Sequence, residues 1–146
     1  MTKLLDGVKT ISLVGNGPIS REAAAGIDSA DLVIRFNQAL LCRVAGKRTD
    51  VLVVNGRWFD PSRAVRGRPA HPHVLKDARE IWVRKLDNPG DISLRDRPVF
   101  EYAKDGTEAL SRELTACGAT VPHPRPTLGL STLDFLLRSS DAHVTL

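Results

Sequence analysis

Hydrophobic residues occur along the chain in short blocks separated by polar, glycine-rich or proline-rich segments. Four blocks rich in β-branched residues predict buried β-strands over Lys9–Val14, Asp31–Phe36, Asp50–Val54 and Glu80–Val83. Ala142–Leu146 has the same character and predicts a last strand. The second and third blocks are apolar at successive positions, which is typical of strands covered by helices on both faces, and parallel pairing is the default for such strands.

Three segments between these strands have helical patterns. Ser20–Gly26 has a serine suited to an N-cap, an early glutamate, three alanines and a terminal glycine. Asp105–Cys117 has apolar residues near helical spacing and is followed by glycine. Thr127–Ser139 predicts a third helix, whereas Asn55–His73 predicts an irregular connection. The alternation predicts an α/β fold with a largely parallel sheet, as a single domain over residues 1–146.

The composition limits the classes of protein to be considered. A chain of 146 residues that is 42% hydrophobic can form a core without disulfides or a metal. Its apolar runs are much shorter than the ~20 residues that span a bilayer, and the N-terminus lacks the pattern of a signal peptide. Cys42 and Cys117 are far apart, and the histidines form no ligand cluster with them. We expect a cytoplasmic protein with no membrane span, metal site or resident cofactor.

The net charge of +4 favours an anionic partner. Many arginines lie between Arg57 and Arg97, where a nucleic-acid surface could form. Only Trp58 and Phe59 place aromatic rings among them, so stacking platforms for bases are scarce. The pattern favours a solvated arginine-rich surface over nucleic-acid binding.

The segment after the first predicted strand is a candidate phosphate or nucleotide loop. Gly15, Asn16 and Gly17 lie between a strand and a helix, where glycines allow a ligand to approach the backbone. A dinucleotide fingerprint would have glycine at Ser20 and an acidic residue near Arg35, so NAD is disfavoured. Two alternatives remain open: an NADP site in which Arg35 faces a phosphate, and a simple tight turn.

Two further places could contribute to such a site. Asn37, like Asn16, follows the carboxyl end of a predicted strand, which is where open α/β sheets bind ligands. An asparagine amide can donate to a phosphate or ribose oxygen and accept from a base. Thr127 and Gly129 open the last predicted helix, where amides and a hydroxyl could meet a phosphate. The alternative is that both asparagines form local turns.

Taken together, three blocks resemble the large sialyl motif of the sialyltransferases that use CMP-sialic acid: Ile11–Gly17, Ile27–Ala39 and Gly46–Thr49. Their order and spacing match over about forty residues. Pro126–Leu146 resembles the small sialyl motif of the same family, with Pro-Thr-Leu-Gly where the family usually has Pro-Ser-Thr-Gly. Asn55–Pro124 has no recognisable counterpart, so the resemblance covers about half of the chain.

The resemblance implies a Rossmann-like three-layer sandwich and a site for a cytidine nucleotide. Asn16 and Asn37 would hold the nucleotide, beside Gly15 and Gly17, while Thr127 and Gly129 would lie near the ribose and phosphates. Leu128 occupies the position of the family threonine and removes one hydroxyl.

The departures from the family concern redox state and catalysis. The positions of the family disulfide are Ile11 and Ser140 in this chain, which agrees with a reducing compartment. The family's general base lies beyond the small motif, where this sequence has ended, and neither His123 nor His143 occupies its position. The catalytic residues therefore stay unassigned, and a domain shortened at its C-terminus is expected to lack a positioned base.

Three hypotheses follow. The first is a sialyltransferase-like domain that binds CMP or a related nucleotide or nucleotide-sugar, either as a metal-independent glycosyltransferase or as a degenerate one. The alternative is an accessory or scaffold protein that uses the fold for protein contact, since bacterial proteins with this signature are often labelled urease operon accessory proteins. An exposed apolar strand at the C-terminus would also favour a homodimer. The third, an arginine-driven nucleic-acid binder, is the weakest.

Overall fold

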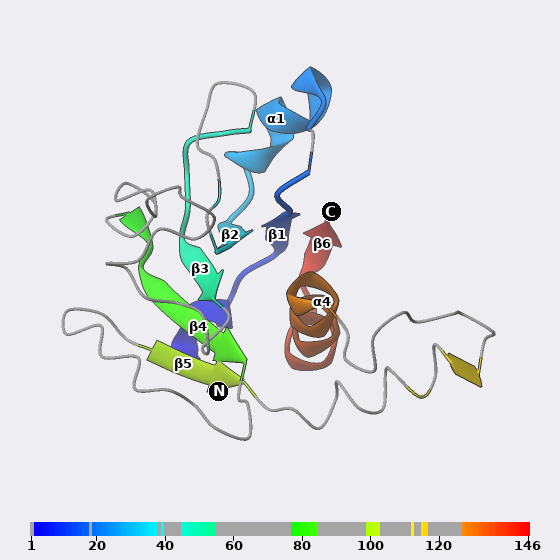
Figure 1. The fold of residues 1–146 in the computed structure, drawn as a ribbon. Helices are drawn as coiled ribbons and strands as arrows, with labels where there is room; N and C mark the ends of the chain where they lie inside the picture. The colour runs from blue at the N-terminus through cyan, green and yellow to red at the C-terminus, as the bar shows by residue number, and fades with distance from the viewer. Residues whose placement is uncertain are drawn as a thin grey trace, which may run out of the picture.

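The computed structural model describes residues 2–17, 19–37, 39, 45–54, 77–84, 99–102, 112, 115–116 and 127–146. Within these ranges six strands form one sheet (Figure 1). The strands are β1 (Thr10–Val14), β2 (Leu32–Phe36), β3 (Val51–Val54), β4 (Glu80–Arg84), β5 (Val99–Tyr102) and β6 (His143–Thr145). The helices are the 3-10 turn η1 (Lys3–Leu5), α1 (Arg21–Ile27) and α4 (Leu128–Ser139).

All pairs of neighbouring strands are parallel, in the order β5-β4-β3-β2-β1-β6. The chain steps from β1 to β5 in one direction and then returns to place β6 on the other side of β1. Because parallel crossovers are right-handed, the step from β1 to β2 and the return to β6 put α1 and α4 on opposite faces of the sheet. The α/β fold and its parallel sheet are confirmed.

Side-chain packing assigns α1 and α4 to the two faces. Ile27 of α1 packs with Val14 and Val33 on one face. Leu136 of α4 belongs to the larger cluster on the other face, with Ile11 and Leu13 of β1 among its members. Alternate residues of β1 therefore face different helices, which is why four successive residues of this strand, Ile11–Val14, are buried. The result is the helix–sheet–helix layering expected from the sequence.

Each helix begins at a hydroxyl cap. The Ser20 side chain accepts from the backbone N–H of Ala23, and α1 continues through an alanine-rich turn. Thr127 accepts in the same way from the N–H of Leu130 at the start of α4. The Ser20 cap was predicted from the sequence, and α4 starts at the predicted position, with Thr127 as its cap. The C-cap of α4 is Ser140, whose extended backbone leads the chain into β6.

An aromatic cluster joins α4 to β4 and β5. Trp82 is fully buried, and its ring lies 5.7 Å from that of Phe100 and 5.6 Å from that of Phe135, both in edge-on geometry. Its indole N–H donates to Glu80, which also accepts from the hydroxyl of Thr2. Such pairs add about 0.5–1.5 kcal/mol beyond burial. This cluster fixes α4 against the sheet.

The predicted strands and two of the predicted helices match the structure to within about two residues at each end. The structure adds β5, which is short, lies at the edge of the sheet and includes a glutamate, so its pattern is weak. It also adds η1. The predicted helix over Asp105–Cys117 lies outside the described residues except for 112 and 115–116, and the predicted irregular connection over Asn55–His73 lies outside them entirely.

Candidate functional site

The structure brings Asn16 and Asn37 to the same edge of the sheet. Val14 of β1 pairs with Arg35 of β2, and each asparagine follows its paired residue by two positions. Both residues are exposed. The carboxyl ends of two adjacent parallel strands thus present two amide side chains, as the sequence predicted.

Asn37 has a left-handed backbone conformation, with φ of 46°. Its N–H donates to the carbonyl of Val53 on β3 at 2.9 Å, which ties the turn to the neighbouring strand. Asparagine tolerates this region of φ better than most side chains because its amide can form local hydrogen bonds. The left-handed conformation therefore explains an asparagine at this position even if no ligand binds there. This explanation is compatible with a binding role for the amide.

The first turn of α4 packs beside the end of β2. A Cβ atom placed on Gly129 would meet the Phe36 ring at 3.9 Å, and Phe36 immediately precedes Asn37. Thr127, one residue before the helix, is exposed and caps it. The structure therefore places Thr127 and Gly129 at the carboxyl edge near Asn37, on the face covered by α4. Chemically, this edge offers backbone N–H groups, a hydroxyl and two amides to an anionic or hydroxylated ligand.

The two glycines of the predicted loop have a different neighbourhood. Gly15 and Gly17 line a cleft of about 560 Å³ between α1 and the strands β1 and β6. Asn37, Thr127 and Gly129 do not line this cleft. Of the six predicted residues, Gly15 and Gly17 therefore lie on the α1 face, whereas Thr127 and Gly129 lie on the face covered by α4.

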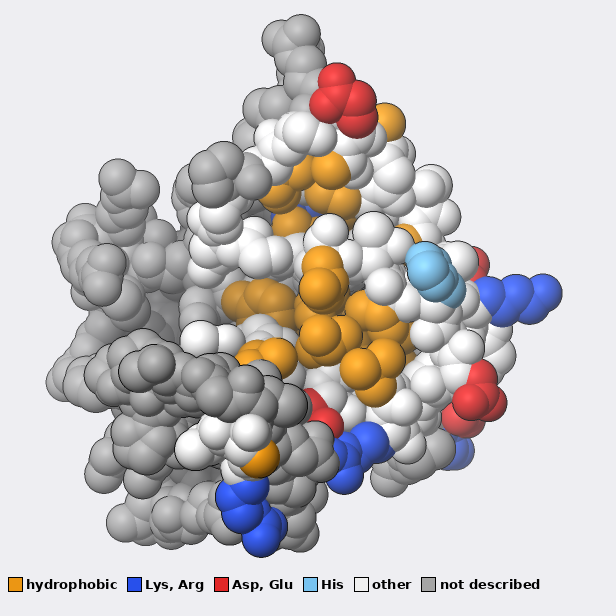
Figure 2. Space-filling model, turned by 90° about the vertical axis from the view of Figure 1, so that its right-hand side faces the viewer, with side chains coloured by type: hydrophobic (Ala, Val, Ile, Leu, Met, Phe, Trp, Pro, Cys, Tyr) orange, Lys and Arg blue, Asp and Glu red, His pale blue; other side chains and the backbone are white. Residues whose placement is uncertain are grey.

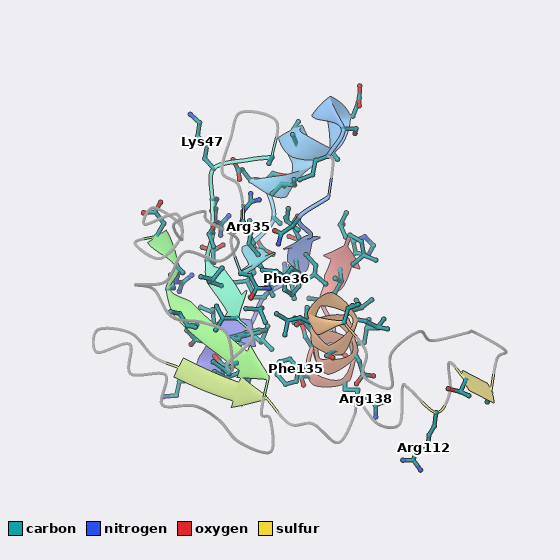
Figure 3. All side chains as sticks on the ribbon, viewed as in Figure 1. Arg35, Phe36, Lys47, Arg112, Phe135 and Arg138 are labelled. Atoms are coloured by element: carbon teal, nitrogen blue, oxygen red, sulfur yellow. The ribbon has the colours of Figure 1, made fainter. Side chains whose placement is uncertain are left out.

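Arg35 does not have the position required for an NADP site. Its side chain is only 1% exposed, and its guanidinium donates to the carbonyl oxygens of Arg48 and Ala45 at 2.9 and 2.5 Å. Figure 3 shows Arg35 within the fold, beneath the turn that carries Lys47. The alternative in which Arg35 faces a cofactor phosphate is therefore wrong, because this side chain holds the turn before β3.

A carboxylate holds the same turn from the other side. Asp28 accepts from the backbone N–H groups of Lys47 at 2.8 Å and Arg48 at 3.0 Å. Gly46 has φ of +76°, and a Cβ there would lie 2.6 Å from the Asp28 carboxylate. Sequence reasoning found Gly46–Thr49 only as a part of the family resemblance. In the structure this segment is a turn that Asp28 binds to the second block of that resemblance, and its glycine was the available signal.

The opposite, amino edge of the sheet is held by Asp31. Its carboxylate accepts from the backbone N–H groups of Lys9 and Thr10, both at 3.0 Å. These two hydrogen bonds, with that of Lys9 the larger influence, lower the pKa of Asp31 below its ordinary value. Asp31 therefore has a structural role at the start of β1 and β2, away from the carboxyl edge.

Within the described ranges, no group of three or more His, Cys, Asp or Glu side chains is arranged to hold a metal ion. No helix in those ranges has the length and apolar character needed to cross a bilayer.

Comparisons with known proteins give one curated relative. The chain is 41% identical over 78 residues to the "Urease operon 23 kDa accessory protein" of Rhizobium meliloti (strain 1021). The match covers 51% of this chain and 35% of the relative, so the chain spans about a third of that protein's length. No protein-family model matches the chain, and no solved structure matches it. The similarity is to an accessory protein, and the resemblance to sialyltransferases stays a prediction.

Proposed function

We propose that this protein is an accessory protein of a urease system and acts through contact with another protein. The observation that carries the proposal is the 41% identity over 78 residues to the urease operon accessory protein. This reading corresponds to the alternative of an accessory or scaffold protein that the sequence left open. It requires a surface suited to protein contact and does not require a catalytic base.

The surface formed by α4 and β6 supports this role. Figure 2 shows hydrophobic side chains gathered on the face that carries these elements. Leu137 of α4 and Leu146 after β6 are 65% and 80% exposed, the large hydrophobic residues with the greatest exposure in the described ranges. Contiguous exposed apolar surface is a common mark of protein interaction sites.

The experiment is removal of the gene from its host, followed by measurement of urease activity. We expect activity to fall and the wild-type gene to restore it. A Leu137→Lys variant should restore activity less well, because the lysine places a charge in the apolar surface. Ala25→Lys is the matched control, since Ala25 is also exposed in the second half of a helix but lies on α1. Unchanged urease activity in the deletion strain would contradict the proposal.

A second candidate function is binding of CMP or a related nucleotide at the carboxyl edge. It is supported by the convergence of Asn16, Asn37 and the first turn of α4. We would measure thermal unfolding with CMP, CDP, UMP, AMP and NADP. A ligand at a hundredfold excess over its Kd adds about 2.7 kcal/mol of stability, so even weak binding is measurable.

The matched variant for this test is Asn37→Gly, which removes the amide but accepts a positive φ. We expect CMP to stabilise the wild-type protein and not the variant. Absence of a shift with every nucleotide would exclude the binding site, while leaving the accessory role untouched. Glycosyl transfer would require an acceptor and a base, and is tested only after binding is established.

A further inference from the structure

The cleft beside α1 has features of a small-molecule site. It has a volume of about 560 Å³, within the range of roughly 300–1,000 Å³ that is typical of ligand pockets. Its floor is formed by β1 and the end of β6, and one wall is α1. Val14, Ile19 and Ile27 make its inner part apolar, and Ala23 and Gly26 leave space along the wall.

The cleft exists because α1 covers only part of its face of the sheet. Ile27 packs over β1 and β2, where it meets Val14 and Val33. On the other side of β1, β6 forms the edge of the sheet, and its Thr145 is exposed. The sheet between α1 and that edge is therefore open to a ligand.

A buried polar group lies in this apolar floor. Ser12 is 5% exposed and lies on the α1 face of β1, between the registers of Val33 on β2 and Thr145 on β6. Its hydroxyl forms no hydrogen bond with any described residue, although the residue lines the cleft. Because Ser12 lines the cleft, a ligand there can form a hydrogen bond with its hydroxyl, and one such bond contributes about 0.5–1.5 kcal/mol.

The charges around the cleft restrict what can bind. Among the described lining residues the one ionisable side chain is Glu22, which is exposed, and none of them is a lysine, arginine or histidine. A phosphate or carboxylate would find no cation among these residues and would meet the Glu22 carboxylate at the rim. The apolar walls and the Ser12 hydroxyl suit an uncharged molecule with an apolar body and one hydrogen-bonding group.

We propose that the cleft lined by Ser12, Val14, Ala23, Ile27 and Thr145 binds a small uncharged molecule whose polar group hydrogen-bonds to the Ser12 hydroxyl. Asn37 and Thr127 lie outside the cleft, whereas Gly15 and Gly17 line it, and its proposed ligand is of a different class from a nucleotide. Leu146 belongs both to the cleft and to the apolar surface of α4 and β6, whereas Leu137 lies outside the cleft. The Leu137→Lys variant therefore distinguishes failure of the accessory role from failure of this proposal.

The test uses three probes of one shape in NMR titrations of the ¹⁵N-labelled chain. Benzyl alcohol has the apolar body and hydroxyl, toluene lacks the hydroxyl, and benzoate carries a negative charge. We expect saturable shifts of the amide signals of β1 and α1 with benzyl alcohol, weaker binding of toluene and none of benzoate. No saturable shift with benzyl alcohol, or equal binding of benzoate, would overturn the proposal.

Three variants locate the site. Ala23→Leu should fill the cleft and abolish binding, whereas Ala25→Leu, the same change at an exposed residue of α1 outside the cleft, should leave it intact. Ser12→Ala should weaken the affinity for benzyl alcohol by roughly two- to tenfold, because one hydrogen bond is lost. The affinity for toluene should stay unchanged. Equal binding by the two leucine variants, or an unchanged preference for benzyl alcohol in Ser12→Ala, would exclude this assignment. The amide spectrum of each free variant verifies its fold.

Discussion

Asn37 combines the amide proposed for nucleotide binding with a left-handed backbone conformation. Among the described residues it is the one non-glycine residue with a positive φ, 46°. Alanine has no local hydrogen bond to offset the steric cost of this conformation, whereas glycine has no such cost. We predict that Asn37→Ala is about 1 kcal/mol less stable than Asn37→Gly, measured by urea unfolding. Equal stability of the two variants would show that the backbone does not explain the asparagine.

Gly46 is required for a different reason, since both its φ of +76° and its surroundings exclude a side chain. A Cβ would lie 2.6 Å from Asp28, which accepts from the next two backbone N–H groups. We predict that Gly46→Ala lowers the free energy of unfolding by at least about 1–2 kcal/mol.

Gly26 provides the control for Gly46. It lies in α1, and a Cβ atom placed on Gly26 meets nothing within 4 Å. Gly26→Ala should raise the free energy of unfolding by up to about 1 kcal/mol, through helix propensity. Denaturant titration of both variants measures the two changes. A Gly46→Ala variant as stable as the wild type would mean that the turn before β3 can rearrange.

At the scale of elements, α4 has one face in the core and one in solvent. Leu136 is fully buried against the sheet, whereas its neighbour Leu137 is 65% exposed. We predict that Leu136→Ala costs about 2–5 kcal/mol of unfolding free energy, the usual result of a cavity in a core. Leu137→Ala should change it by no more than about 0.5 kcal/mol. Thermal and urea unfolding of Leu136→Ala and Leu137→Ala tests whether α4 packs on the sheet through Leu136 and exposes Leu137.

The same contrast bears on the proposed function. A surface leucine that contributes little to folding is free to serve in contact with a partner, so Leu137→Lys can reduce urease-related function without unfolding the protein. If the Leu137 variants lost urease-related function in proportion to their loss of unfolding free energy, the cause would be a folding defect instead.

At the scale of the whole molecule, Asp31 links folding to pH. Its pKa in the folded protein is lowered by the N–H groups of Lys9 and Thr10, and an unfolded aspartate titrates near about 3.9. The stabilisation is therefore complete above the unfolded pKa and is lost as the pH falls through the folded one. We predict that unfolding free energy falls on acidification below about pH 4 and that Asp31→Asn makes this fall shallower.

Urea titrations at several pH values measure this effect in the wild type and the variant. An identical acid dependence in both would mean that Asp31 keeps its ordinary pKa in the folded state.

Sequence patterns predicted most of the described elements because each has a local physical cause. The β-branched runs of β1 to β4 and the hydroxyl caps of α1 and α4 are such causes. β5 was missed because an edge strand of four residues with a central glutamate has little pattern of its own. The position of Asn16 beside Asn37 was predictable as well, since adjacent parallel strands end at one edge.

The sequence by itself determined the α/β class, the parallel pairing and the residues at the carboxyl edge, because these follow from periodicity and from turn residues close to one another in the chain. Only the tertiary structure decided the role of Arg35, the place of Ser12 in the floor of the cleft and the exposure of Leu137. Each depends on which residues from distant segments lie against that side chain: Ala45 and Arg48 for Arg35, the partly covering α1 for Ser12, and open solvent for Leu137. Spacing along one strand or helix does not contain that information.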